Sequence, residues 1–130
     1  MIRYLGVKEV LRIHQQVIRE FGGSHGVRDL GLLESAVARP KAGFGDYEAY
    51  PTVVEKAAVL LHSIAKNHAF VDGNKRTALT SARTFLKRNG FLIRSDHPAL
   101  LSFTLDVAEG RIDEPAMAAW LSDHTRPIRS

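Results

Sequence analysis

A run of ten residues, His68-Ala69-Phe70-Val71-Asp72-Gly73-Asn74-Lys75-Arg76-Thr77, brings together the side chains that phosphate chemistry requires. It contains an imidazole, a carboxylate, a glycine turn and two adjacent cations. Apolar residues at helical spacing precede and follow it, so we expect a tight loop that leads through Gly73 and Asn74 into a helix. Helix starts bind anions, because their first backbone N–H groups are unpaired and the dipole is positive there. The run therefore predicts a phosphate-binding loop over residues 68–76.

His68 and Asp72 each have two interpretations. Histidine titrates near neutrality, so His68 could accept a proton from a hydroxyl that attacks phosphorus, although a histidine at a helix end more often bonds a carbonyl. Asp72 could hold Mg²⁺, which binds carboxylate and phosphate oxygens together with water, although Asp-Gly is also a common turn. The other histidines keep the structural interpretation; they are His14, His25, His62, His97 and His124.

The remaining residues of the run are ambiguous when taken one at a time. Gly73 permits a positive φ and close approach of a ligand, and Asn74 could bond phosphate oxygens or hold the loop. Lys75 and Arg76 are cations at a helix start, where the dipole disfavours them, and this local conflict favours a bound anion, although a solvated basic pair is common on any helix. Phe70 is interpreted as a core residue that locks the loop between two helices.

Apolar spacings of three and four predict the elements that position this loop. Expected helices run over 7–21, from Asp29 to Pro40, over about 52–67, over about 74–88, from Asp96 to before Gly110, and from Asp113 onward. Thr52 and Glu55 form a capping box before the central helix, which is apolar around most of its girth and should be buried. The sequence predicts an all-α fold of about six helices.

The segments between the expected helices show less regular sequence patterns. Residues 41–51 have no sustained period and predict a surface loop or flap, and residues 91–93 could form a short extended piece, although no convincing strand pair is present. The tail from Asp123 onward is polar, and we expect it to fray.

Length and composition limit the class of protein that this chain can be. A chain of 130 residues, 45% of them apolar, suits a compact single domain spanning 1–130. It has no cysteine, no apolar run long enough for a membrane span and no convincing signal peptide, so we expect a cytoplasmic protein. The net charge of +4 favours an anionic partner, but dispersed basic residues and few aromatics give no specific support to nucleic-acid binding.

The ten-residue run resembles the Fic/Doc family motif, in the form His-x-Phe-x-Asp-x-Asn-Lys-Arg of its Doc, or death-on-curing, branch. The likeness continues in the same order along the chain, in Phe21-Gly22-Gly23, in the Gly31-Leu32-Leu33-Glu34-Ser35-Ala36 helix, in the capped central helix and in Arg88-Asn89-Gly90. The resemblance implies a toxin of a toxin–antitoxin system with the all-α Fic/Doc fold.

The resemblance also implies a reaction, in which a group passes from ATP to a protein hydroxyl. In that reaction His68 is the base, Asp72 holds Mg²⁺, and residues 73–76 hold phosphates. Most Fic enzymes attach AMP and carry Gly-Asn-Gly-Arg-x-x-Arg after the acid. This chain has Lys75 in place of the second glycine and Leu79 in place of the last arginine. In the Doc branch this lysine accompanies phosphorylation of a threonine of elongation factor Tu, so the resemblance favours a kinase that blocks translation over an adenylyltransferase.

Three further expectations follow from the resemblance. The flap over residues 41–51 is similar to the family's target-docking hairpin, so Phe44 and Tyr47 could pair with an extended substrate segment, or simply pack on the core. Lys66 stands where Doc toxins carry a basic residue and could contact phosphate. A built-in inhibitory motif is lacking, since Thr104 to Glu109 has one residue too many, and inhibition by an antitoxin in trans is expected.

Two other classes stay open beside the kinase. The run could dock a nucleotide or an acidic partner without turnover, which makes the protein a binding module. A helical nucleic-acid binder has only the basic charge in its favour.

Overall fold

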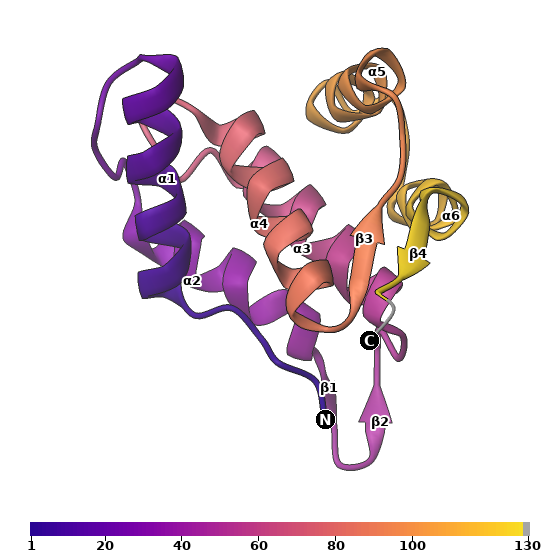
Figure 1. Ribbon diagram of the computed structural model, residues 1–130. Coiled ribbons are helices and arrows are strands. Elements are labelled where there is room, and N and C mark those ends of the chain that lie inside the picture. The colour runs from indigo at the N-terminus through magenta and orange to yellow at the C-terminus, as the bar shows by residue number, and fades with distance from the viewer. Residues whose placement is uncertain (129–130) are drawn as a thin grey trace.

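The computed structural model describes residues 1–128, and helices make up most of this part of the chain (Figure 1). Within it the α-helices are α1 (Val7–Phe21), α2 (Leu30–Ala38), α3 (Val53–Asn67), α4 (Asn74–Arg88), α5 (His97–Ala108) and α6 (Glu114–His124). A 3₁₀ helix, η1 (Arg39–Lys41), follows α2. The all-α prediction and its six helices are confirmed.

The central helix is α3. Nine of its fifteen residues are buried, as its almost continuous apolar surface predicts. It packs most extensively against α4 and then against α6. Figure 1 shows α3 and α4 side by side in the middle, with α1 and α2 on one flank and α5 and α6 on the other. The loop between α3 and α4 is therefore attached to the two most deeply supported helices.

Side-chain caps begin four of the helices. A side-chain oxygen accepts a bond from a backbone N–H three residues on, at Asp29, Thr52, Asp96 and Asp113. The box at Thr52 differs in one detail from the expected arrangement. Its hydroxyl donates to the Glu55 carboxylate at 2.9 Å, whereas a glutamate reaching back to the cap N–H was expected.

Residues 41–51 contain a short antiparallel hairpin that joins β1 (Gly43–Phe44) to β2 (Tyr47–Glu48). Gly43 requires its glycine, because its φ is +146° and a Cβ there would lie 2.1 Å from the Tyr47 carbonyl oxygen. The flap is thus a hairpin, and Figure 1 shows it at the end of the molecule where α3 begins.

The C-terminal tail corrects the expectation of fraying. The helix α6 continues to His124, and β4 (Thr125–Pro127) pairs antiparallel with β3 (Phe91–Ile93). The tail is held because β3 offers an unpaired backbone edge, and Ile128 N also donates to the Gly90 carbonyl at 2.8 Å. The end of the expected frayed segment, residues 129 and 130, lies outside the described residues.

Over residues 1–128, the structure contains no helix that is both long and apolar enough to cross a membrane.

Candidate active site

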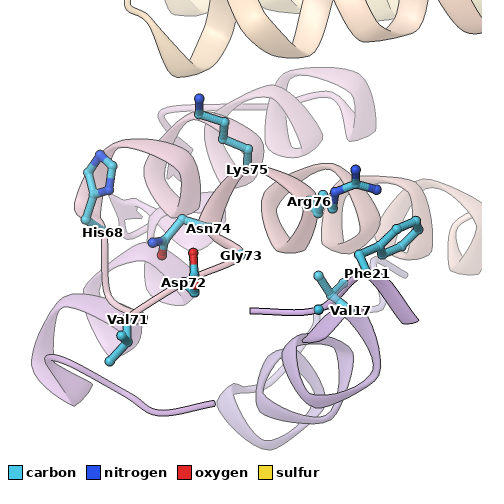
Figure 2. A pocket seen from close by; sticks show the side chains of 10 residues that line it. Val17, Phe21, His68, Val71, Asp72, Gly73, Asn74, Lys75 and Arg76 are labelled. Atoms are coloured by element: carbon cyan, nitrogen blue, oxygen red, sulfur yellow. The ribbon is translucent and has the colours of Figure 1, made fainter. Parts of the chain in front are cut away.

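The loop between α3 and α4 borders a cavity of about 440 Å³ (Figure 2), a volume in the range of small-molecule sites. Most of the residues singled out in the ten-residue run line it. The lining consists of Val17, Phe21, Gly22, His68, Val71, Asp72, Gly73, Asn74, Lys75 and Arg76. In Figure 2 the side chains of His68 and Lys75 point to the same side of the loop.

His68 ends α3 in an unusual backbone conformation. Its φ of 49° and ψ of 47° are left-handed, and it is the one non-glycine residue with positive φ among residues 1–128. This geometry turns the chain sharply, so the imidazole is exposed at the cavity while the neighbouring Ala69 and Phe70 are buried. An exposed ring on a buried support is what a proton acceptor for an incoming hydroxyl requires.

Phe70 and Asn74 hold the loop in shape. Phe70 is 1% exposed, which agrees with the interpretation as core. Asn74 accepts a bond from Phe70 N at 3.1 Å and donates to Phe70 O at 3.0 Å. Because both polar atoms of its amide face the Phe70 backbone, Asn74 holds the loop, which was one of its two interpretations.

His14 is a supporting residue that sequence analysis did not connect with the site. It is 3% exposed, its ring stacks on Phe70 with centroids 3.8 Å apart, and its Nε2 lies 2.8 Å from the Asp72 carbonyl oxygen. A histidine on the apolar face of α1, between Val10 and Val17, is the signal that pointed to a buried partner.

Asp72 presents a carboxylate beside the glycine pair that follows α1. Its Oδ2 accepts a bond from Ser24 N at 3.1 Å, and a Cβ on Gly23 would lie 3.0 Å from the same oxygen. Asp72 is otherwise exposed, so its second oxygen stays available to a ligand. Residues 1–128 contain no cluster of three metal-ligating side chains, and a single carboxylate suits Mg²⁺ that is otherwise bound by phosphates and water.

The start of α4 is the cationic part of the cavity. Gly73 is its N-cap with a φ of +76°, and it supplies no side chain to bond the free N–H groups of the first turn. Lys75 and Arg76 are exposed, and neither forms a salt bridge within the described part of the chain. The Arg76 guanidinium lies 3.8 Å over the Phe21 ring, which holds it at the cavity (Figure 2).

Lys66 is not brought to this cavity. It is exposed on the last turn of α3, and its amine lies 3.0 Å from the position that a Cβ on Gly110 would take, just beyond α5. The phosphate contact suggested for Lys66 therefore has no support in its placement.

The predicted docking residues Phe44 and Tyr47 do not line this cavity. Their hairpin stands before the first residue of α3, whereas His68 follows its last, and fifteen helical residues span about 22 Å. The segment beside the loop is 26–29: Val71 N donates to the Gly26 carbonyl, and Val27 forms a β-bridge with Phe70. Local sequence marks a flap by its turn residues, but which loop reaches the site depends on helix packing.

Comparison with known proteins agrees with the geometry. A sequence model of the Fic/DOC family matches residues 4–86, which include α1 and the whole loop. Toxin Doc of Mycolicibacterium smegmatis is 47% identical over 116 residues, which cover 89% of this chain and 82% of that protein. Protein kinase doc of Escherichia phage P1 is 36% identical over 117 residues, which cover 90% and 91%.

The chain therefore belongs to the Fic/DOC family. Within it, the protein is of the Doc type, the toxin branch that its loop sequence resembles.

Proposed function

We propose that this protein transfers the γ-phosphoryl group of ATP to a hydroxyl of a protein substrate, and that this reaction makes it a toxin. One observation carries the proposal. A single cavity holds the exposed imidazole of His68, the exposed carboxylate of Asp72 and the helix start with Lys75 and Arg76. This set contains a base, a metal ligand and an anion site, which are the parts that phosphoryl transfer needs.

The proposed step uses each of these groups once. The acceptor oxygen forms a bond to the γ-phosphorus, the bond from that phosphorus to the β,γ-bridging oxygen breaks, and ADP leaves. His68 takes the hydroxyl proton. Asp72 would hold Mg²⁺, which neutralises phosphate charge when bound. The free N–H groups after Gly73, with Lys75 and Arg76, bind the phosphate oxygens.

AMP transfer is the alternative reaction at the same residues. It requires attack at the α-phosphorus, with pyrophosphate leaving. Lys75 favours phosphoryl transfer, because it occupies the position of the glycine that AMP-transferring Fic enzymes carry, and a relative with 36% identity is named a protein kinase.

The acceptor is proposed to be a threonine of elongation factor Tu, which would block translation in the cytoplasm. Since the 43–48 hairpin is remote, we place docking of the acceptor segment along the loop before α2. Three apolar side chains are exposed along this loop and the loop that it pairs with: 42% of Val27, which bridges to Phe70, 50% of Leu30, the first residue of α2, and 56% of Val71, which lines the cavity. Such a rim fits a protein segment better than a small acceptor.

Inhibition is proposed to come from a cognate antitoxin, because both relatives are Doc proteins and the sequence has no inhibitory motif of its own. A pure binding module is the non-enzymatic alternative. It predicts that His68→Ala leaves growth arrest intact.

The test is incubation of the protein and elongation factor Tu with ATP labelled at the γ-phosphate or, in parallel, at the α-phosphate. We expect label on the factor from γ-labelled ATP alone, and none with the His68→Ala variant. Label from the α position alone would replace the kinase with an AMP transferase, and no label from either would remove the enzymatic proposal.

A further inference from the structure

Arg28, in the loop before α2, reaches the end of α3 although the two lie far apart in sequence. Its Nε donates to the His68 carbonyl oxygen at 2.8 Å, and its Nη2 donates to the Asn67 carbonyl oxygen at 3.3 Å. A guanidinium is suited to two neighbouring carbonyls, because its N–H donors form a rigid fork.

These carbonyls are the groups that a helix leaves without partners at its C-terminus. At the ends of α1, α2, α4 and α5, the N–H of the cap residue donates back to a carbonyl of its own helix. At the end of α3 the donor is the Arg28 side chain. A cation is also favoured at this end of a helix by the dipole.

The residue at that end is His68 in its left-handed conformation. This conformation is disfavoured for an L-residue with a Cβ and persists only where surrounding contacts impose it. The contact that Arg28 makes with the His68 carbonyl acts directly on the peptide group whose rotation would release the conformation.

The backbone around Arg28 is anchored separately from its side chain. Arg28 N and Asp29 N both donate to the Ala69 carbonyl oxygen, at 2.7 and 3.0 Å, and Asn67 Nδ2 donates to the Leu32 carbonyl oxygen. Removing the guanidinium therefore leaves the segment attached to the loop. Its effect on His68 can be measured apart from the fold.

We propose that Arg28 is a positioning residue, whose guanidinium holds the His68 backbone in the left-handed conformation that places the imidazole at the cavity. The inference rests on the proposed function, in which His68 is the base. The Arg28 guanidinium bonds the two carbonyls and does not line the cavity, so in this assignment it touches neither ATP nor the reacting hydroxyl, although the acceptor segment is proposed to run along the same loop.

The test compares Arg28→Ala and Arg28→Lys with Arg83→Ala. Arg83 is an exposed arginine on α4 whose side chain has no hydrogen bond or salt bridge within residues 1–128, so it is the matched control. We expect kcat for phosphoryl transfer to fall about ten- to a hundredfold in Arg28→Ala, because small displacements of a reacting group are this costly. KM for ATP should stay within about twofold, since phosphate binding is untouched.

Arg28→Lys should recover part of kcat, since it keeps one donor and the charge, and Arg83→Ala should match the wild type. The second measurement is the NMR Cα and Cβ shifts of His68, which report its backbone conformation without any reaction. They should leave left-handed values in Arg28→Ala and keep them in Arg83→Ala.

Unchanged His68 shifts in Arg28→Ala would overturn the proposal, and so would a kcat that stays within about twofold of wild type. If Arg28→Ala does not fold, Arg28→Met, which keeps an unbranched side chain without a donor, decides by the same two criteria. If the wild type transfers nothing from ATP, the proposed function has failed, and the shifts alone decide whether Arg28 holds His68.

Discussion

The two ends of α3 are secured in opposite ways. At its beginning, the side chain of Lys56 is buried, and its amine donates to the Tyr50 carbonyl at 2.5 Å and to the Glu48 carboxylate at 2.9 Å. At its end, the loop is held mainly through its own backbone carbonyls: that of Ala69 accepts from Arg28 N and Asp29 N, and that of His68 accepts from the Arg28 side chain.

Because the two ends are held differently, residues at the start of α3 serve the stability of the fold, and side chains at its end are free for the proposed reaction. Burial lowers the pKa of Lys56, but the bond to Glu48 and the proximity of Tyr4 outweigh it, so the net pKa is raised and the ammonium is kept charged. That side chain is fully committed to the fold. At the other end, backbone carbonyls of the loop accept the bonds from neighbouring segments, and the side chains of His68 and Lys75 stay exposed at the cavity. The account therefore predicts that variants at the two ends alter different properties.

The largest effect is expected at the exposed end. His68→Ala should lower the rate of phosphoryl transfer by about a thousandfold, because a positioned base contributes about this much. The free energy of unfolding should be nearly unchanged, since the ring is exposed. The check is the initial rate at saturating ATP beside urea denaturation of the same sample. A variant that keeps more than about a tenth of the wild-type rate would contradict the role of His68 as base.

The next effect is expected at the buried end. Lys56→Met should lower the free energy of unfolding by about 2–3 kcal/mol, because the Tyr50 carbonyl and the Glu48 carboxylate lose their partner. Urea denaturation measures it, with Lys66→Met as a control that removes an exposed lysine of the same helix. The control should change stability by less than about 0.5 kcal/mol. Equal losses in both variants would show that burial of Lys56 contributes nothing.

Glu114 gives a pH-dependent test of the buried end. Burial raises the pKa of its carboxyl, but bonds to Arg39 and His62, both with contacts at 2.6 Å, outweigh this and hold the pKa below 4.5. A depressed carboxyl pKa stabilises the fold above the ordinary value, and this contribution is lost as pH falls through the folded-state value.

Glu114→Gln should therefore be less stable than wild type at pH 7, by about 1 kcal/mol for a partly exposed ion pair. The difference in stability between the two proteins should shrink as the pH falls below the ordinary pKa of a glutamate. Thermal unfolding as a function of pH measures it, and a gap of constant size down to about pH 3 would mean that Glu114 is not the titrating group.

The smallest effect is expected for the 43–48 hairpin. Phe44→Ser and Tyr47→Ser should change kcat/KM for the protein substrate by less than about twofold, because both side chains lie at the far end of α3. Val27→Ser, beside the cavity, should raise the KM for the protein severalfold. Greater loss of activity in the hairpin variants than in Val27→Ser would support docking at the hairpin instead.

Local signals explain what sequence alone could predict. Apolar spacing revealed all six helices, caps such as Asp29 and Thr52 marked where helices begin, and the spacing from His68 to Arg76 identified the residues of the loop. These features depend on residues within a few positions of one another. Most residues of the site lie in one such short segment, so the sequence could reveal them.

The remaining features depend on contacts between distant segments. His14 meets the Asp72 carbonyl across 58 positions, and Arg28 meets the His68 carbonyl across 40. The pairing of β3 with β4 likewise joins segments more than thirty residues apart. No short window of sequence shows such contacts, because helix packing creates them, and the same holds for which loop lies beside the cavity.

The most direct test of the central claim is mass spectrometry of elongation factor Tu after incubation with the wild-type protein and unlabelled ATP. The account predicts a factor heavier by one phosphoryl group, located on a threonine. A factor heavier by AMP, or one of unchanged mass, would contradict the assignment of the His68–Arg76 loop to phosphoryl transfer.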